Sequence, residues 1–214
     1  MNMKLLAAAA VAALSMGLSA NAAVTTVGNQ AAFNAAGTIT QNTNWDSYGP
    51  SFSFPGNNFV VGDLTFVAGA ENLIGEAGPG GVYNTGRNLL TDNFVRGTTI
   101  QIAGLHDLFA FNLGNFFNTG AANISVTTNL GNYNFSPVVT TAVNSGGVFT
   151  FAGYQASAGE YFTSVNYSGG GATGATDIQL GSAGAVPEPA TWAMMIIGFG
   201  AAGSMIRRRK VVIA

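Results

Sequence analysis

Hydrophobic and polar residues alternate along most of the middle of the chain, and clusters of Gly, Asn, Thr and Ser separate the alternating segments. A period of two is typical of strands with one buried face, and the separating residue types favour turns. The pattern predicts strands at 38–40, 58–61, 64–67, 98–103, 108–113, 124–128, 133–135, 148–152, 162–167 and 177–180. Short strands at this spacing, with little helical signal between them, predict an all-β antiparallel sandwich.

One short helix is predicted in this domain, at 30–36, where Gly37 follows as a glycine C-cap would. No internal repeat of fixed period is found in the sequence, which disfavours solenoid and β-helix folds. The same absence leaves an ice-binding-type protein only as a lesser alternative, because a flat threonine ladder needs a Thr-x-Thr unit repeated on stacked turns.

The N-terminal segment has the three parts of a secretory signal peptide. Lys4 precedes an apolar run from Leu5 to about Leu18, and Ala20 and Ala22 form a small-x-small cleavage pattern. The sequence therefore predicts a signal helix within 1–22, export through the secretion machinery, and Ala23 as the mature N-terminus.

The C-terminal segment predicts a membrane anchor. Residues 190–206 contain no charge, and a helix of this length spans about 25 Å, close to the minimum for a bilayer. Basic side chains follow at once and should remain in the cytoplasm, so that the domain lies outside. They are Arg207, Arg208, Arg209 and Lys210.

The predicted organisation is a signal peptide at 1–22, a β-sandwich domain at 23–180, a linker at 181–189, a transmembrane helix at 190–206 and a basic tail at 207–214.

Between the two ends the chain has two basic residues, Arg87 and Arg96, against eight acidic ones, a formal net charge of −6. Such a surface repels phosphate backbones, so no nucleic-acid partner is expected. The chain has no cysteine, which excludes disulfides and thiolate chemistry.

Two prolines at the start of the tail favour an extended, accessible peptide around Pro187, Glu188 and Pro189. Trp192 and Ala193 follow, then the apolar segment and the basic cluster. This combination resembles the PEP-CTERM sorting signal of Gram-negative bacteria, in its PEP-x-x-Trp-Ala form. The resemblance implies recognition by an exosortase, a transient inner-membrane anchor, cleavage near the motif, and delivery to the envelope or exopolysaccharide matrix.

The domain resembles the jelly-roll domains often found ahead of such a tail. Many of these open with a small helix bearing Ala-x-Phe, continue with an aromatic-Asp pair and Gly-x-x-Phe, and end with an Asp-hydrophobic strand. The corresponding segments here are 32–34, 45–46, 62–66 and 177–178. The resemblance implies a jelly-roll-like sandwich and no particular function.

No strong catalytic motif is present. His106, the single histidine, precedes Asp107 and could be a general base, but no nucleophile elbow occurs and a solvated loop pair is expected. Glu71 and Glu76 fall in a glycine-rich segment, 69–86, that we expect to be an irregular loop, with Asp92 downstream. Paired carboxylates occur in glycosidases, but this spacing fixes no geometry. A non-enzymatic protein is therefore expected, with a secreted hydrolase as a lesser alternative.

Two binding sites are candidates. Asp46, Asp63 and Asp177 could hold a structural calcium ion if the terminal strands pair, because hard cations prefer carboxylate oxygens. Trp45 and Tyr48 are flanked by polar residues and could form an exposed sugar-binding surface. The predicted function is thus a structural surface or biofilm-matrix protein, with a carbohydrate-binding or adhesive module as the alternative.

Overall fold

The computed structural model describes residues 23–48, 52–77, 87–92, 97–115, 119–140, 149–169, 173–184, 194–201 and 203. The chain divides into two compact units, one of Ala20–Gly184 and one of Met1–Ser19 with Ala185–Ala214.

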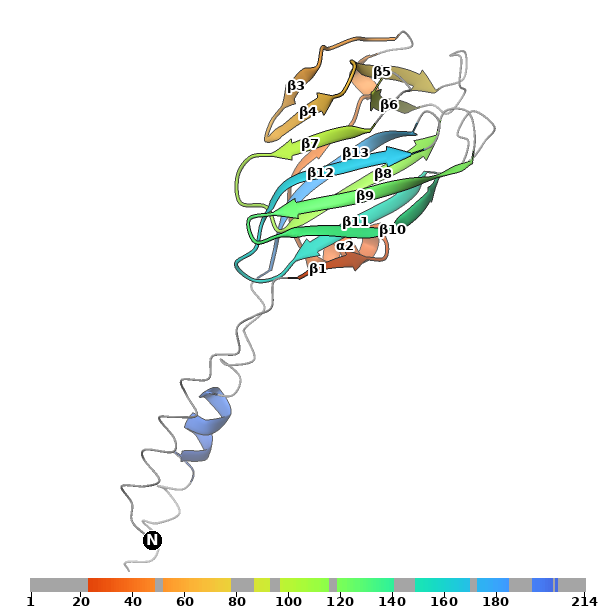
Figure 1. Cartoon of the computed structure of the whole chain (residues 1–214). Helices are drawn as coiled ribbons and strands as arrows, with labels where there is room; N and C mark the ends of the chain where they lie inside the picture. The colour runs from red at the N-terminus through yellow and green to blue at the C-terminus, as the bar shows by residue number, and fades with distance from the viewer. Residues whose placement is uncertain are drawn as a thin grey trace, which may run out of the picture. The chain divides into compact units, whose positions relative to one another are not determined.

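The described residues of Ala20–Gly184 form two antiparallel sheets (Figure 1). The first sheet has the order β1-β11-β8-β13-β6-β5, and β2 also pairs with β13. Its strands are β1 (Val24–Val27), β2 (Gly37–Thr43), β5 (Asn72–Ala77), β6 (Arg87–Asp92), β8 (Leu108–Asn115), β11 (Thr150–Ala156) and β13 (Thr173–Ala183).

The second sheet has the order β10-β9-β12-β7-β4-β3. Its strands are β3 (Asn58–Val61), β4 (Leu64–Ala68), β7 (Thr98–Ile102), β9 (Gly120–Thr128), β10 (Asn132–Thr140) and β12 (Phe162–Gly169). The two sheets confirm the predicted all-β antiparallel sandwich.

Alternation along the strands creates the core between the sheets. In β7, Thr98, Ile100 and Ile102 are buried while Gln101 is exposed. The core draws on both sheets, with Phe66 from the second and Phe111 from the first. Because each sheet contributes one apolar face, the domain buries a continuous core without a disulfide.

The short helix predicted at 30–36 is present as α2 (Gln30–Ala36), and it lies on the outer face of the first sheet. The Asn29 side chain caps it by accepting a hydrogen bond from the Ala32 N–H at 2.9 Å. Phe33 is fully buried against Leu108 and Ala110 of β8. Gly37 then starts β2, where a Cβ atom would collide with the backbone of Ser182 and Ala183.

Three segments differ from the sequence prediction. The segment expected as an irregular loop, 69–86, contains strand β5, and the unpredicted strand β6 that pairs with it follows directly; the residues of neither alternate clearly enough to be recognised. β1 was not predicted; it is a four-residue edge strand paired with β11. β13 continues to Ala183, so the first three residues of the expected linker are strand residues paired with β2.

In the other unit, the described residues 194–201 and 203 are helical. Among the described residues, the structure contains no helix with the length and apolar character needed to span a bilayer. The remainder of the predicted span, the basic tail and the predicted signal helix lie outside the described residues.

Candidate functional site

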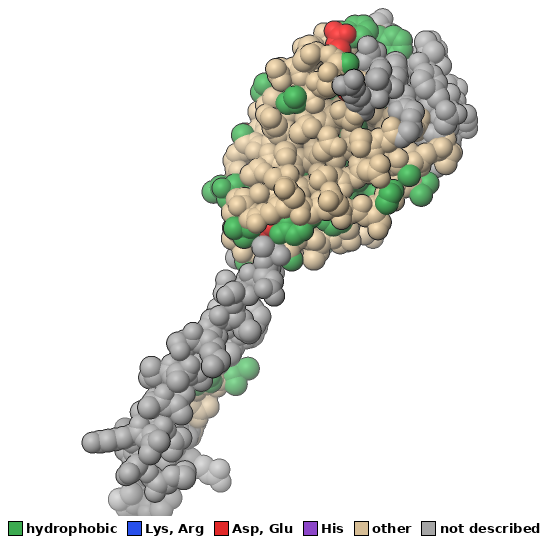
Figure 2. All heavy atoms as spheres, in the orientation of Figure 1, with side chains coloured by type: hydrophobic (Ala, Val, Ile, Leu, Met, Phe, Trp, Pro, Cys, Tyr) green, Lys and Arg blue, Asp and Glu red, His purple; other side chains and the backbone are tan. Residues whose placement is uncertain are grey.

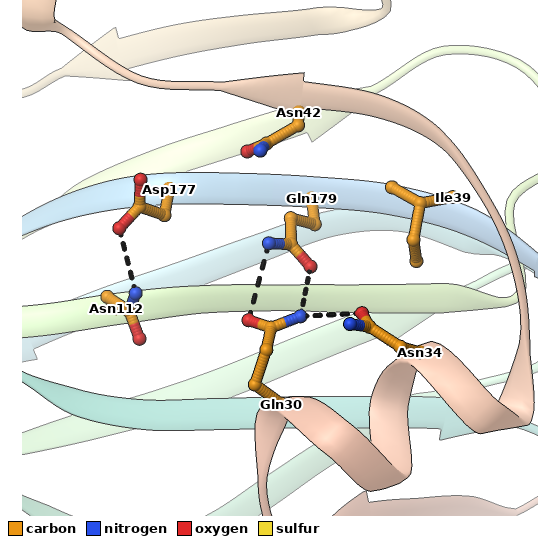
Figure 3. A pocket seen from close by; sticks show the side chains of 7 residues that line it. All are labelled: Gln30, Asn34, Ile39, Asn42, Asn112, Asp177 and Gln179. Atoms are coloured by element: carbon orange, nitrogen blue, oxygen red, sulfur yellow. Dashed lines mark hydrogen bonds between the residues drawn. The ribbon is translucent and has the colours of Figure 1, made fainter.

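The first sheet and α2 line a cleft of about 480 Å³ that is open to solvent, on the outer face of the sandwich (Figure 3). We call it the amide cleft, because carboxamide side chains dominate its lining. The lining residues are Gln30 and Asn34 from α2, Ile39 and Asn42 from β2, Asn112 from β8, and Asp177 and Gln179 from β13. Four separate elements thus converge on one polar depression.

The backbone of β13 is irregular at this cleft. The register against β8 shifts between Thr176 and Gln179, and Asp177 adopts a positive φ of 49°. Among the described residues, it is the one non-glycine residue in this left-handed region. Bulges re-aim side chains and are common beside functional sites. Here the bulge places the Asp177 carboxylate in the cleft, where it accepts a hydrogen bond from Asn112 Nδ2 at 2.9 Å.

A chain of amides forms the rest of the cleft floor. Gln30 Nε2 donates to Gln179 Oε1 at 2.8 Å, and Gln179 Nε2 donates back to Gln30 Oε1 at 3.3 Å. Gln30 Nε2 also donates to Asn34 Oδ1 at 2.8 Å. Figure 3 shows these side chains pointing toward one another from α2 and β13. The lining offers amide donors, amide acceptors and one carboxylate, a set suited to ligands rich in hydroxyl groups.

The exposure expected of Trp45 in the predicted sugar-binding surface is wrong. Trp45 is 1% exposed, and its indole N–H donates to the Ala175 carbonyl at 2.9 Å. Its ring packs edge-on against Phe66 with centroids 5.2 Å apart. Tyr48 is half-buried against Phe59. The polar neighbours of Trp45 suggested exposure, but the side chain fills the core instead.

The three carboxylates of the predicted calcium site have separate surroundings. Asp63 Oδ2 lies 2.9 Å from His106 Nε2, Asp177 lies in the amide cleft, and Asp46 is exposed at the start of a 3₁₀ turn, η1 (Asp46–Tyr48). The terminal strands β2 and β13 do pair, as that prediction assumed. Within the described part of the chain, however, no three acidic or histidine side chains are grouped so that they could hold a metal ion.

His106 is buried rather than solvated, and its partner is Asp63 instead of Asp107. Thr40 Oγ1 lies 3.4 Å from His106 Nδ1, which brings a hydroxyl, an imidazole and a carboxylate into one row. The Thr40 hydroxyl, however, donates to the Leu180 carbonyl at 3.2 Å. Asp107 accepts from the Ala183 N–H, holding the end of β13. These residues form a polar cluster whose hydrogen bonds hold strand ends and loops together.

Asp92 is buried and anchors a turn. Its carboxylate accepts the backbone N–H groups of Gly69, Ala70 and Glu71 at 3.1, 2.9 and 3.1 Å. Such contacts satisfy three donors that the turn would otherwise leave unpaired. Glu71 ends this turn, and Glu76 belongs to β5, where its side chain lies outside the described part of the structure. The structure therefore assigns Asp92 a structural role.

One acidic site was not found from the sequence. Glu160 is 2% exposed, and its carboxylate accepts four hydrogen bonds. The donors are Thr128 Oγ1 at 2.5 Å, Tyr133 Oη at 2.6 Å, Ser157 Oγ at 2.8 Å and the Ala23 backbone nitrogen at 2.9 Å. A turn residue flanked by Gly159 gave no signal of burial, because most of its partners lie far away in the sequence, on β9, on β10 and just before β1.

The four donors set the ionisation of Glu160. Burial raises the pKa of its carboxyl, but the hydrogen bonds from Thr128, Tyr133, Ser157 and Ala23 together lower it by more, so that the pKa lies below its usual range. The Glu160 hydrogen bond also raises the pKa of the Tyr133 phenol. The site therefore holds a carboxylate and a neutral phenol at neutral pH.

Comparison with known families identifies one segment of the chain. The model of the PEP-CTERM protein-sorting motif matches residues 185–210, which include Pro187, Glu188, Pro189 and Trp192. No curated protein matches the chain. The matched segment also contains Ala193 and the basic residues Arg207, Arg208, Arg209 and Lys210, and confirms the resemblance found in the sequence. Residues 185–210 are a PEP-CTERM protein-sorting motif, the mark of an exported protein that an exosortase processes.

Proposed function

We propose that the protein is a non-enzymatic component of the cell envelope or exopolysaccharide matrix, delivered there by exosortase processing. The sorting motif at residues 185–210 carries this proposal, because it implies export and a transient association with the membrane. Cleavage of a signal peptide before Ala23 and temporary anchoring by the apolar segment 190–206 complete the proposed route.

The ectodomain supports a structural role through its surface and its polar sites. Charged residues are 7% of the chain, and the face in Figure 2 shows few charged side chains among its described residues. The polar clusters at Asp92 and His106 hold turns and strand ends rather than facing a substrate cleft. Hydrolase assays on ester, glycoside and peptide substrates should show no turnover, and activity abolished by His106→Ala would overturn the non-enzymatic assignment.

The amide cleft favours a second function, the binding of a neutral polysaccharide. Carboxamides and carboxylates bind adjacent sugar hydroxyls by donating and accepting at the same time. The lining contains Asp177 and no Lys or Arg, so its charge disfavours anionic sugars. A neutral glycan of the matrix in which the protein resides fits this chemistry, and would give the structural role an attachment point.

Asn112→Ala is expected to weaken binding to neutral matrix polysaccharide about tenfold, because it removes an amide donor from the cleft and one hydrogen bond to the Asp177 carboxylate. Co-sedimentation of the full chain with purified polysaccharide measures the effect. Asn134→Ala, an exposed site on β10 of the other sheet, is the matched control and should bind normally. Equal binding by both variants would exclude the amide cleft as the polysaccharide site.

A further inference from the structure

Glu160 is a buried carboxylate whose four donors are all neutral in the uncleaved chain. They are two hydroxyls of Thr128 and Ser157, the phenol of Tyr133 and the backbone amide of Ala23. Burying a charge is costly unless a counter-charge or several hydrogen bonds compensate it. A cation at any one of these four positions would lower the cost of burying the Glu160 carboxylate.

The Ala23 nitrogen is the one donor that processing converts into a cation. It lies 2.9 Å from Glu160 Oε2 and 3.2 Å from Ser157 Oγ, so it already faces two acceptors. The sequence independently predicts Ala23 as the first residue of the mature chain, from the small residues Ala20 and Ala22. The hydrogen bond to Glu160 and the cleavage pattern in the sequence thus point independently to the Ala23 nitrogen.

We infer that the Glu160 carboxylate is a built-in receptor for the α-ammonium group of Ala23, which exists only after cleavage between Ala22 and Ala23. Hydrolysis by a membrane-bound signal peptidase consumes one water molecule. The Ala22 carbonyl carbon gains its oxygen and leaves as a carboxylate, and the Ala23 nitrogen becomes an ammonium group. The inference rests on the export step of the proposed function and adds a site that this step completes.

The surrounding strands fix the ammonium group in place. Val24 pairs with Ala156 at the start of β1, and the Ser157 N–H donates to the Ala23 carbonyl at 2.9 Å. The Glu160 N–H donates in turn to the Ser157 carbonyl at 3.0 Å, closing the turn that carries the carboxylate. Cleavage therefore replaces the hydrogen bond from a neutral amide to the carboxylate with an ion pair, without moving the chain. The ion pair ties edge strand β1 to the β11–β12 connection.

A double-mutant cycle tests the inference on the exported full chain, purified in detergent with its tail intact. One change inserts an alanine between Ala22 and Ala23, so that the mature chain starts one residue earlier and the ammonium group moves outward by about 3.5 Å. The other change is Glu160→Gln, which removes the charge and keeps the shape. Mass spectrometry first confirms the N-terminal residue of each variant.

The insertion is expected to lower the folding equilibrium constant, folded over unfolded, about tenfold when Glu160 is present. In the Glu160→Gln chain the insertion should change the folding equilibrium constant far less, because the ammonium group then has no counter-charge to lose. Glu71→Gln is the matched control and should leave the effect of the insertion unchanged. An insertion cost that is the same with the native Glu160 as in the Glu160→Gln chain would overturn the inference.

The pH dependence of stability gives a second test. The titratable groups that contact Glu160 are Tyr133 and the Ala23 amine. The lowered pKa of Glu160 adds stability above its ordinary value of 4.5, which is lost as pH falls through the folded-state value. A raised α-amine pKa adds stability below its ordinary value of about 8, which is lost as pH rises through the folded-state value.

The free energy of unfolding should therefore be greatest between pH 4.5 and about 8. Glu160→Gln should flatten its dependence on pH on both the acidic and the basic side. NMR of the ¹³C-methylated amine, which keeps its charge, should show the Ala23 amine titrating above about 8. Titration at the ordinary value would contradict the ion pair even if the variants failed to fold. A mature chain that starts elsewhere than Ala23 would also overturn it, while leaving exosortase processing at the other end untouched.

Discussion

Replacing Pro187, Glu188 and Pro189 with alanine is expected to leave the whole protein as an unprocessed, membrane-associated form. The matched sorting motif begins at residue 185. The sequence predicts that its two prolines disfavour helix and favour an extended peptide, which a processing enzyme can bind. Alanine favours helix and removes both the fixed φ angles and the acidic side chain. Immunoblots of membrane and extracellular fractions measure the change.

Thr191→Ala is the matched control, because Thr191 occupies a variable position of the PEP-x-x-Trp-Ala pattern. This variant should be processed and delivered as the unmodified protein is. If the triple variant reaches the same fraction at the same apparent size as the control, residues 187–189 are not the recognition element.

Trp45→Ala is expected to destabilise the domain by about 3–5 kcal/mol. The indole is 1% exposed, packs against Phe66, and donates its N–H to the Ala175 carbonyl. Alanine leaves a large cavity between the sheets and removes the buried hydrogen bond to the Ala175 carbonyl, and both losses are costly. Urea unfolding followed by circular dichroism gives the free energy of unfolding.

Trp45→Phe separates the two contributions, because it keeps a ring in the core and removes the N–H donor. Its expected cost is about 0.5–1.5 kcal/mol, the net contribution of one hydrogen bond. A Trp45→Ala protein with unchanged stability and lost polysaccharide binding would restore Trp45 as an exposed sugar-binding residue and contradict its place in the core.

Strands with clear alternation could be predicted from the sequence. The segments that became β7 and β8 have apolar residues at every second position or a continuous apolar run, and α2 has a glycine at its end. β5 and β6 were missed because Gly, Asn and Glu interrupt their apolar residues, and a buried Asp92 holds the turn before them. The Asp92 carboxylate binds the N–H groups of residues 69–71, which lie 21 to 23 positions earlier, and no local pattern in the sequence indicates these hydrogen bonds.

The polar sites could be predicted only where a local motif defines them. The sorting motif is contiguous, so residues 187–189 and 192–193 were found from the sequence. The amide cleft unites residues from α2, β2, β8 and β13, and Glu160 meets Ala23 across 137 positions. Such sites follow from the pairing of strands, which residue spacing does not fix. Trp45 shows the opposite error, since polar neighbours along the chain do not determine whether a side chain faces solvent.

The intact mass of the protein recovered from the native cell surface tests the account most directly. The account predicts a chain that starts at Ala23 and ends near Pro187–Pro189, without the segment 194–214. In a strain lacking the exosortase, the same measurement should find the tail retained and the protein in the membrane. Surface protein that still carries residues 194–214, in equal amount with and without the exosortase, would contradict the proposal that this motif sorts the protein.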